Sequence, residues 1–246
     1  MFRGMFVTGT DTNVGKTVVS AALMLRYRAE ARLRYWKPVQ TGIERDDDSS
    51  EVARLARCRP EEIFNCGVRL PRPVSPHLAA RLSGTRITVR ALVEQLREAD
   101  RREADLTLRH AQGHPEPGRG VKVRPATARW IVEGAGGVLV PLNERETMAD
   151  LILALHLPVI VAARSTVGTI NHTLLTIEAL RRRMMRVAGV IMVGPPDDDN
   201  RVAIEKYGAA EVIAEMPHFT PLSPDALAAW AATQFDLNGV LVGCLR

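Results

Sequence analysis

Cysteine is scarce in this chain, and its three copies form no pattern that serves chemistry. Cys58, Cys66 and Cys244 lack the spacing of metal ligands, and three cysteines cannot build a disulfide framework. Residues 1–5 do not show a basic segment followed by an apolar one, so the sequence predicts no secretory leader. We therefore expect a protein of the reducing cytoplasm.

Long apolar runs and aromatic residues are also few. No run approaches the roughly 18 apolar residues that a membrane span needs, which predicts no membrane association. Hydrophobic residues make up 46% of the 246 residues but aromatic ones only 4%. The sequence therefore predicts a globular protein with a sizeable core built from Val, Ile, Leu and Ala.

The basic excess of the chain is concentrated in one segment. The net charge is +5, and within 107–129 five basic residues accompany one glutamate, among several prolines and glycines. A basic segment can bind the phosphates of nucleic acids, but this one contains no interleaved aromatic residue. We expect a single domain over 1–246 that carries a mobile inserted loop around 106–128, and no nucleic-acid partner.

Hydrophobic periodicity predicts alternating strands and helices. Strands are expected at 5–8, 33–36, 130–132, 158–163, 187–193 and 212–214, and helices at 17–29, 51–57, 88–103, 148–155, 169–183, 200–207 and 224–232. Continuously apolar strands separated by helices indicate an α/β fold whose mostly parallel sheet has helices on both faces. Binding sites in such folds lie beyond the carboxyl ends of the strands.

The first expected strand is followed by Gly-Thr-Asp-Thr-Asn-Val-Gly-Lys-Thr at 9–17. Its ending is typical of a phosphate-binding loop (P-loop), in which Lys16 reaches the outer phosphates and the hydroxyl of Thr17 can coordinate Mg²⁺. The usual spacing would place the first glycine one residue after Gly9, and a chance Gly-Lys-Thr is the alternative. Its position between a strand and a helix favours a P-loop NTPase-like fold that binds a nucleotide.

Three further polar groups follow strands, each with two interpretations. Lys37 could simply extend to solvent. The run Asp-Asp-Asp at 46–48 could cap a helix, or one carboxylate could bind Mg²⁺. Glu133 precedes the glycine-rich residues 134–137, where a tight turn would explain the glycines but not the glutamate.

Five motifs occur in an order and spacing that together resemble the dethiobiotin synthetase family. They are the P-loop at 9–17, Lys-Pro-Val-Gln-Thr-Gly at 37–42, Ser-Pro-His at 75–77, Val-Glu-Gly-Ala-Gly-Gly at 132–137 and Gly-Thr-Ile-Asn-His at 168–172. A weaker pattern, Asn200, Tyr207-Gly208 and Pro217, extends the resemblance towards the C-terminus. Apart from the P-loop each motif is weak alone, but their combination is specific.

The resemblance implies an ATP- and Mg²⁺-dependent ligase of biotin biosynthesis. Such an enzyme converts 7,8-diaminononanoate, CO2 and ATP into dethiobiotin, ADP and phosphate, the penultimate step of that pathway. One amine is carbamated, the carbamate oxygen attacks the γ-phosphate to form a carbamic–phosphoric anhydride, and the second amine closes the ring. The resemblance also implies a homodimer with the active site at the subunit interface.

Residue roles are implied by the same resemblance. Lys37 and Lys16 would be catalytic, since both neutralise charge during phosphoryl transfer. Thr17, Asp48 and Glu133 would be the Mg²⁺ ligands, with Asp47 the alternative to Asp48. The implied nucleotide-binding residues are Asn13, Val14, Gly15, Lys16, Thr17, Val18, Asp48, Glu133, Gly134, Ala135, Gly136, Pro217, His218 and Phe219. The implied substrate-binding residues are Thr12, Thr41, Gly168, Thr169, Ile170 and Asn171, the last four supplied by the partner subunit. His77 and His172 are expected to pack or cap rather than catalyse.

Two departures from the family pattern stand out. The segment around 106–128 is an insertion remote from the motifs. After the strand at 187–193, many members carry an asparagine that reads adenine, whereas this chain has Met192-Val193-Gly194. We therefore expect loose discrimination of the nucleotide base.

Two other functions remain open from sequence. A partitioning-type ATPase would bind DNA or a partner, but that group has a lysine near the start of its P-loop where this chain has Asp11. A small-molecule kinase usually needs an arginine-rich lid, which only the 107–129 segment could supply. Phosphate release that requires bicarbonate and 7,8-diaminononanoate would distinguish all three.

Overall fold

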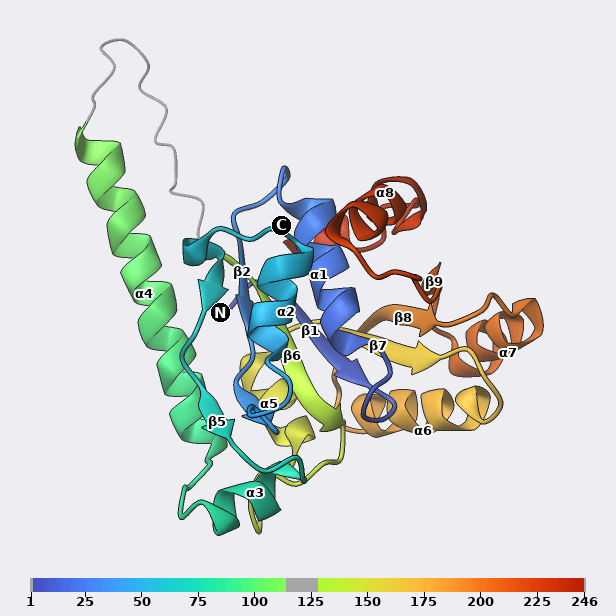
Figure 1. Ribbon diagram of the computed structural model, residues 1–246, viewed down its shortest axis with the longest axis horizontal. Coiled ribbons are helices and arrows are strands. Elements are labelled where there is room, and N and C mark those ends of the chain that lie inside the picture. Colours follow the sequence, from blue (N-terminus) through green and yellow to red (C-terminus); the bar gives the residue numbers. More distant parts are fainter. Residues whose placement is uncertain (1, 114–127, 246) are drawn as a thin grey trace.

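A seven-stranded sheet forms the centre of the computed structural model, which describes residues 2–113 and 128–245, without the side chains of 106–113. Its strands are β1 (Gly4–Gly9), β2 (Leu33–Trp36), β4 (Ile63–Phe64), β6 (Arg129–Gly137), β7 (Val159–Arg164), β8 (Val187–Val193) and β9 (Val212–Met216). They are ordered β4-β2-β6-β1-β7-β8-β9, and every neighbouring pair is parallel (Figure 1). The prediction of a mostly parallel sheet is confirmed.

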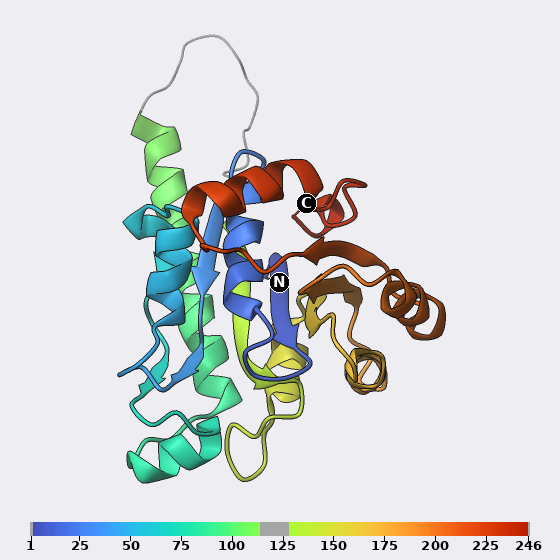
Figure 2. The same ribbon diagram turned by 45° about the vertical axis from the view of Figure 1, so that its right-hand side comes forward.

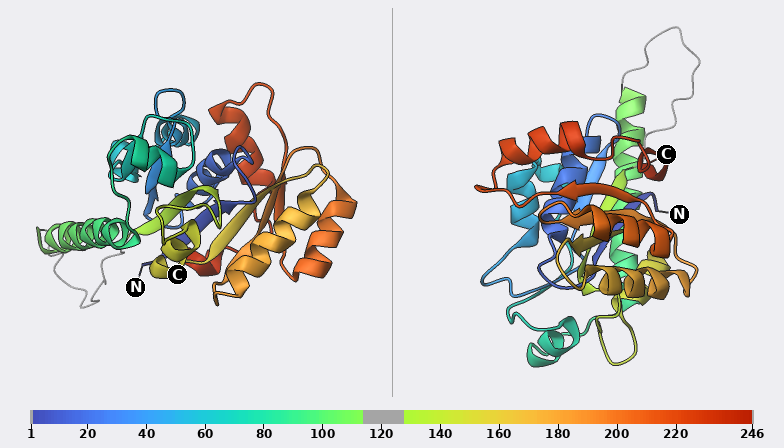
Figure 3. Two further views of the ribbon diagram at one scale, coloured as in Figure 1. Left: turned by 90° about the horizontal axis from the view of Figure 1, so that it is seen from below. Right: turned by 90° about the vertical axis from the view of Figure 1, so that its right-hand side faces the viewer.

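Helices pack on both faces of this sheet. One apolar cluster joins the sheet to α1 (Lys16–Tyr27), α2 (Asp48–Leu55), α8 (Pro224–Gln234) and α9 (Val242–Leu245). A second cluster joins it to α3 (Pro76–Leu82), α4 (Val89–Gly113), α5 (Met148–Leu155), α6 (Thr169–Arg181) and α7 (Asp198–Gly208). The view from below shows α1 and α8 on one side of the sheet and α6 and α7 on the other (Figure 3), while α4 runs along one edge of the molecule (Figure 2).

Several short elements have no counterpart in the sequence prediction. They are β3 (Val39–Thr41), β5 (Val68–Leu70), the 3₁₀ turn η1 (Pro60–Glu62), β4, α3 and α9. β3 and β5 pair in parallel as a separate two-stranded sheet. Elements of two to seven residues show too little periodicity to be recognised, and their pairing partners are distant in the chain.

The core is mostly aliphatic, but its largest members are aromatic. Of the 11 Phe, Trp and Tyr residues in the chain, six are among the largest fully buried side chains: Trp36, Trp130, Tyr27, Tyr35, Phe6 and Phe235. The expectation of a core built from Val, Ile, Leu and Ala therefore holds for most core residues but not for the largest ones. A low aromatic content does not decide where the few aromatic residues lie, and large side chains bury the most apolar area.

Two predicted boundaries differ in ways that affect the site. β6 continues through Gly137 rather than ending at 132, so Glu133 lies within a strand instead of after it. α4 continues to Gly113 rather than ending at 103, so the first part of the expected loop at 106–128 is helical. The remainder, 114–127, falls outside the described residues. Among the helices that the structure describes, none is both long and apolar enough to cross a membrane.

Candidate nucleotide and metal site

The P-loop connects the carboxyl end of β1 to α1. Gly15 has a φ of 88° and precedes the helix without a side-chain cap, which leaves the first amides of α1 directed towards the loop. Asn13 is also left-handed, with a φ of 56°. A Cβ added at Gly15 would lie 3.0 Å from Cγ1 of Val193, so glycine permits both this backbone conformation and this close approach. A helix N-terminus framed in this way suits an anion.

Lys16 points back into the loop that precedes it. Its side chain is buried, and Nζ donates a hydrogen bond of 2.8 Å to the carbonyl oxygen of Asp11. Burial, together with the nearby charge of Lys37, lowers the pKa of Lys16 to about 8. The ammonium group therefore lies in an environment that still needs negative charge, which a bound phosphate would supply.

Lys37 joins two carboxylates from distant parts of the chain. Its Nζ lies 2.6 Å from Oδ2 of Asp48, 2.7 Å from Oε1 of Glu133 and 3.1 Å from the carbonyl oxygen of Gly134. Oγ1 of Thr17 lies 2.9 Å from Oδ1 of Asp48 and 3.1 Å from Oε1 of Glu133. Lys37 is 6% exposed and Glu133 is 0% exposed, so the alternative in which Lys37 extends to solvent is wrong.

Charge pairing controls the protonation of this cluster. Burial alone would lower the pKa of Lys37, but the carboxylates of Glu133 and Asp48 outweigh burial and raise the pKa of Lys37. Burial likewise opposes ionisation of Asp48, yet the charge and hydrogen bond of Lys37 lower the pKa of Asp48. Burial and the charges of Glu133 and Asp48 raise the pKa of Tyr35 well above its usual value, so its hydroxyl remains a donor.

The three consecutive aspartates have different positions. Asp47 caps α2, because its Oδ1 accepts from the amides of Ser49 and Ser50, and it also pairs with Arg69 at 2.7 Å. Asp46 is exposed. Asp48 is the first residue of α2 and directs its carboxylate towards Thr17 and Lys37. The geometry therefore favours Asp48 over Asp47 as a metal ligand, which stays a prediction.

Thr17, Asp48 and Glu133 together fit a hard divalent cation. They gather one hydroxyl and two carboxylates, and the positive group now held between the carboxylates is the ammonium of Lys37. Among the described side chains, those of 2–105 and 128–245, no three His, Cys, Asp or Glu residues cluster in a way that could hold a metal. A donor set this small suits Mg²⁺, which usually keeps waters and takes its other ligands from substrate phosphates.

The glycine-rich part of β6 allows close packing around Glu133. A Cβ added at Gly134 would lie 3.0 Å from the ring of Phe6, and Gly136 has a φ of 66°. Ala135 between them is buried. The glycines thus serve a strand that passes closely between its neighbours, rather than the tight turn suggested by the sequence.

A cavity of about 410 Å³ adjoins the P-loop. Its wall comes from three segments: Thr10–Thr12, the connection at 137–141, and α6 through His172, Leu175, Thr176 and Ala179. Thr12 and His172 therefore face the same cavity. Leu139 and Leu175 in this wall are 53% and 55% exposed.

The N-terminus of α6 carries the segment Gly168-Thr169-Ile170-Asn171. Gly168, with a φ of 93°, occupies the cap position without a side-chain cap, and Oγ1 of Thr169 lies 3.4 Å from Oγ1 of Thr173 instead. The side chain of Thr169 therefore does not cap the helix. The amide of Thr169 donates to the carbonyl oxygen of Thr166 at 3.1 Å, which leaves the amides of Ile170 and Asn171 in this first turn to bind an anion.

The segment expected on the base side follows β9 and reaches the end of β8. Gly194 donates to the carbonyl oxygen of Met216 at 2.8 Å, and a Cβ on Gly194 would collide with Oγ of Ser165 and lie 3.4 Å from Nε2 of His218. Together with the contact between Gly15 and Val193, this places Val193 and His218 at the ends of neighbouring strands beside the P-loop. Pro217 and Phe219 flank His218.

For the remaining predicted residues the structure shows fewer contacts with the site. Val18 is half-buried against the apolar cluster of α1, and Thr41 ends β3. His77 lies in the first turn of α3, and its amide donates to the carbonyl oxygen of Pro141 at 3.2 Å. No catalytic role is indicated for His77 or His172. Their assignments stay predictions.

Sequence reasoning missed two residues, one that contacts the cluster and one that holds the neighbouring Asp47. The hydroxyl of Tyr35 donates to Oε2 of Glu133 at 2.9 Å, and Arg69 holds Asp47. Tyr35 lies two residues before Lys37 in a short strand, where the sequence indicates a core residue rather than a site residue. Nothing in the sequence marks Arg69, because its partner lies 22 positions away.

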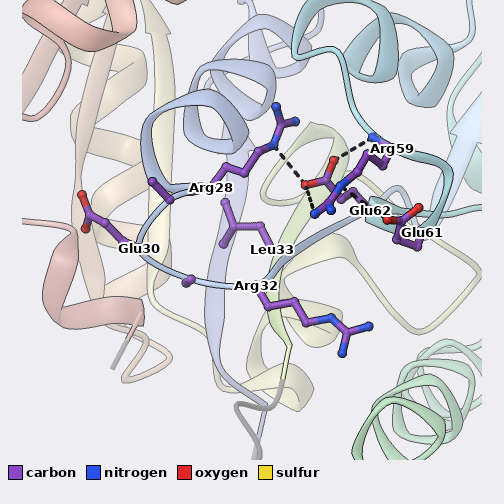
Figure 4. A pocket seen from close by; sticks show the side chains of 9 residues that line it. Arg28, Glu30, Arg32, Leu33, Arg59, Glu61 and Glu62 are labelled. Atoms are coloured by element: carbon purple, nitrogen blue, oxygen red, sulfur yellow. Dashed lines mark hydrogen bonds and ion pairs between the residues drawn. The ribbon is translucent and has the colours of Figure 1, made fainter. Parts of the chain in front are cut away.

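A second hollow, of about 380 Å³, lies at the opposite edge of the sheet. It is lined by the connection from α1 to β2 and by η1. Arg28 and Arg59 both point towards Glu62, at 3.0 and 3.5 Å (Figure 4). These charged groups are paired with one another rather than directed at a common ligand.

Comparison with known proteins identifies the family. A family model described as an AAA domain matches residues 3–226. The ATP-dependent dethiobiotin synthetase BioD of Paramagnetospirillum magneticum is 42% identical over 238 residues, which cover 96% of this chain and 98% of that protein. This chain belongs to the dethiobiotin synthetase family. The resemblance noted in the motifs is confirmed.

Other relatives agree on the family and the fold. The dethiobiotin synthetase BioD of Brucella ovis is 39% identical over 95% of each chain. The biotin biosynthesis bifunctional protein BioCD of Bordetella avium is 45% identical over 97% of this chain, which spans 44% of that longer relative. A ParA family ATPase of Chlorobium tepidum (TM-score 0.51, 10% identity) and the MinC:MinD complex of Aquifex aeolicus (TM-score 0.50, 13% identity) share the fold alone. The predicted P-loop NTPase-like fold is thereby confirmed.

Proposed function

We propose that this dethiobiotin synthetase homologue closes the ureido ring of dethiobiotin from 7,8-diaminononanoate, CO2 and ATP. The observation that carries the proposal is the buried cluster of Lys37, Asp48 and Glu133 next to Thr17 of the P-loop. It combines phosphate-binding and cation-binding groups in one place, and it occurs in a chain with near-full-length similarity to dethiobiotin synthetases.

Each residue of the cluster has a task in this reaction. Lys16 and the amides of Gly15 would bind the outer phosphates, and Lys37 would neutralise the carbamate and the transferring phosphoryl group. Thr17, Asp48 and Glu133 would hold Mg²⁺, which when bound lowers the charge on the phosphate oxygens. Because Lys37 now bridges the two carboxylates, its ammonium must shift towards the substrate when the nucleotide complex binds.

The diamine would lie in the 410 Å³ cavity beside the P-loop. Thr12 forms part of its wall, and Thr41 would approach from β3. We propose a homodimer in which the segment Gly168–Asn171 of the partner subunit binds the carboxylate of the substrate through amides of the first turn of α6. The exposure of Leu139 and Leu175 at the cavity supports burial of this face against a second copy.

The remaining proposals concern partners and location. No nucleic acid or membrane is needed for this chemistry, and a cytoplasmic location accords with the scarcity of cysteine.

Phosphate release by the full chain tests the reaction. With MgATP we expect release only when both bicarbonate and 7,8-diaminononanoate are present, with formation of dethiobiotin. Lys37→Met should abolish this release, whereas the matched control Lys206→Met, at an exposed position of α7, should not change it.

The rival functions give different results in the same assay. Release that ignores bicarbonate and the diamine would indicate an ATPase switch. Consumption of ATP with a stable phosphorylated product would indicate a kinase. Either result would overturn the proposal.

A further inference from the structure

The carboxylate of Glu133 uses its two oxygens differently. Oε1 faces Thr17 and Lys37, at 3.1 and 2.7 Å, whereas Oε2 accepts the hydroxyl of Tyr35 at 2.9 Å. Glu133 and Tyr35 are both 0% exposed, so water cannot replace this hydrogen bond. The hydroxyl is thus the donor that satisfies the oxygen turned away from the site.

Strand pairing places the tyrosine beside the glutamate. Tyr35 in β2 is in register with Ile131 in β6, and Glu133 lies two residues further along β6. Side chains two residues apart in a strand point to the same face, so Tyr35 and Glu133 are diagonal neighbours on one face of the sheet. The ring of Tyr35 packs in the apolar cluster between this face and the helices α1 and α2. The position of the hydroxyl is therefore set by packing.

Loss of that donor would affect the oxygen that faces the site. A carboxylate with one oxygen fixed cannot turn about its terminal bond without breaking a buried hydrogen bond, which is costly. With Oε2 unsatisfied, Glu133 could rotate to seek another donor, and Oε1 would leave its position between Thr17 and Lys37. Groups behind metal ligands commonly control metal affinity in this way.

We propose that Tyr35 is a positioning residue that holds Glu133 in the orientation needed to bind the divalent cation of the nucleotide complex. The proposal rests on the proposed function only in taking Glu133 as a metal ligand.

Manganese binding measured by electron paramagnetic resonance tests this directly. The full chain is titrated with Mn²⁺ in the presence of a non-hydrolysable ATP analogue. We expect Tyr35→Phe to weaken Mn²⁺ binding by roughly 10- to 100-fold, the usual effect of losing a group behind a metal ligand. In turnover assays, the Mg²⁺ concentration for half-maximal rate should rise by a similar factor.

Tyr27→Phe is the matched control. Tyr27 is also 0% exposed, and its hydroxyl also donates to a buried carboxylate, Asp236, between α1 and the C-terminal segment. It should lower stability as much as Tyr35→Phe does but leave Mn²⁺ affinity unchanged. Affinity of Tyr35→Phe within twofold of the unmodified protein would overturn the positioning role. Absence of Mn²⁺ binding in the unmodified protein would instead refute the metal site itself.

If Tyr35→Phe is too unstable for the Mn²⁺ titration, its thermal unfolding still tests the coupling to Glu133. If the variant acts by leaving Oε2 of Glu133 without a donor, then adding Glu133→Gln should lower the melting temperature by less than Glu133→Gln does alone, because the two residues are in contact. Additive effects would mean that Tyr35 acts through packing alone and would overturn the proposal.

Discussion

Glu133→Gln should destabilise the free protein by about 3 kcal/mol. Removing one partner of a buried ion pair generally costs about 3–5 kcal/mol, because the other charge stays buried without compensation. Lys37, however, would still have Asp48 at 2.6 Å, which places the expected loss at the lower end. For a chain of this size that corresponds to a fall in Tm of about 6–12 °C.

Urea unfolding in the presence of a chelator measures this change without a stabilising metal. Lys37→Met should also destabilise, since it leaves two neighbouring carboxylates without their cation. The double variant Lys37→Met/Glu133→Gln should cost less than the sum by about 1–3 kcal/mol, as expected for residues in contact. Glu94→Gln, which breaks the exposed pair with Arg90, should change stability by less than about 1 kcal/mol and serves as the control. Additive effects, or a Glu133→Gln variant as stable as the unmodified protein, would refute the buried pair.

Three further results are expected. Because the pKa of Lys16 is lowered to about 8 from 10.5, kcat/KM for MgATP should fall above about pH 8, and Lys16→Arg should abolish this fall in a pH–rate profile. Between these two pKa values the unfolded state binds more protons than the folded state, so Lys16 makes the free energy of unfolding rise with pH over that window. Asp48→Asn should abolish Mn²⁺ binding with little loss of folding, whereas Asp47→Ala should cost about 1 kcal/mol through loss of its helix cap and leave Mn²⁺ binding unchanged. The reverse pattern in the same titration would assign the metal to Asp47. GTP and CTP should support turnover within roughly one to two orders of magnitude of ATP, because Val193 and Gly194 offer no side-chain amide to a base. A roughly ten-thousandfold preference for ATP, measured as kcat/KM side by side, would contradict this expectation.

Local sequence alone was sufficient for the framework of the fold. Apolar runs such as 187–193 and 148–155 mark a strand and a helix whose observed bounds agree with the prediction. Gly-Lys-Thr at 15–17 marks the start of α1 to within one residue. These signals are short-range, since each depends on burial periodicity or on a backbone conformation that only nearby residues determine.

Periodicity was a poor guide where tertiary contacts decide the ends of elements. β6 continues past Val132 because β1 pairs with it as far as Gly137, so the glycines that suggested a turn are part of a strand. β3 and β5, three residues each, exist because they pair with each other across a gap of 26 residues. No local pattern contains that information.

The site shows the same division. Motif order led to the prediction of Thr17, Lys37, Asp48 and Glu133 as site residues, but it did not predict their arrangement. Only the three-dimensional structure shows that Lys37 lies inside, between two carboxylates, because its charge is offset by groups 11 and 96 positions away. The hydrogen bond from Tyr35 to Glu133 depends on the register of β2 against β6, and residue types alone do not predict that register. The sequence by itself determined which chemical groups are present and in what order, and the packing of parallel strands decided which of them meet, because side-chain contacts follow strand register rather than distance along the chain.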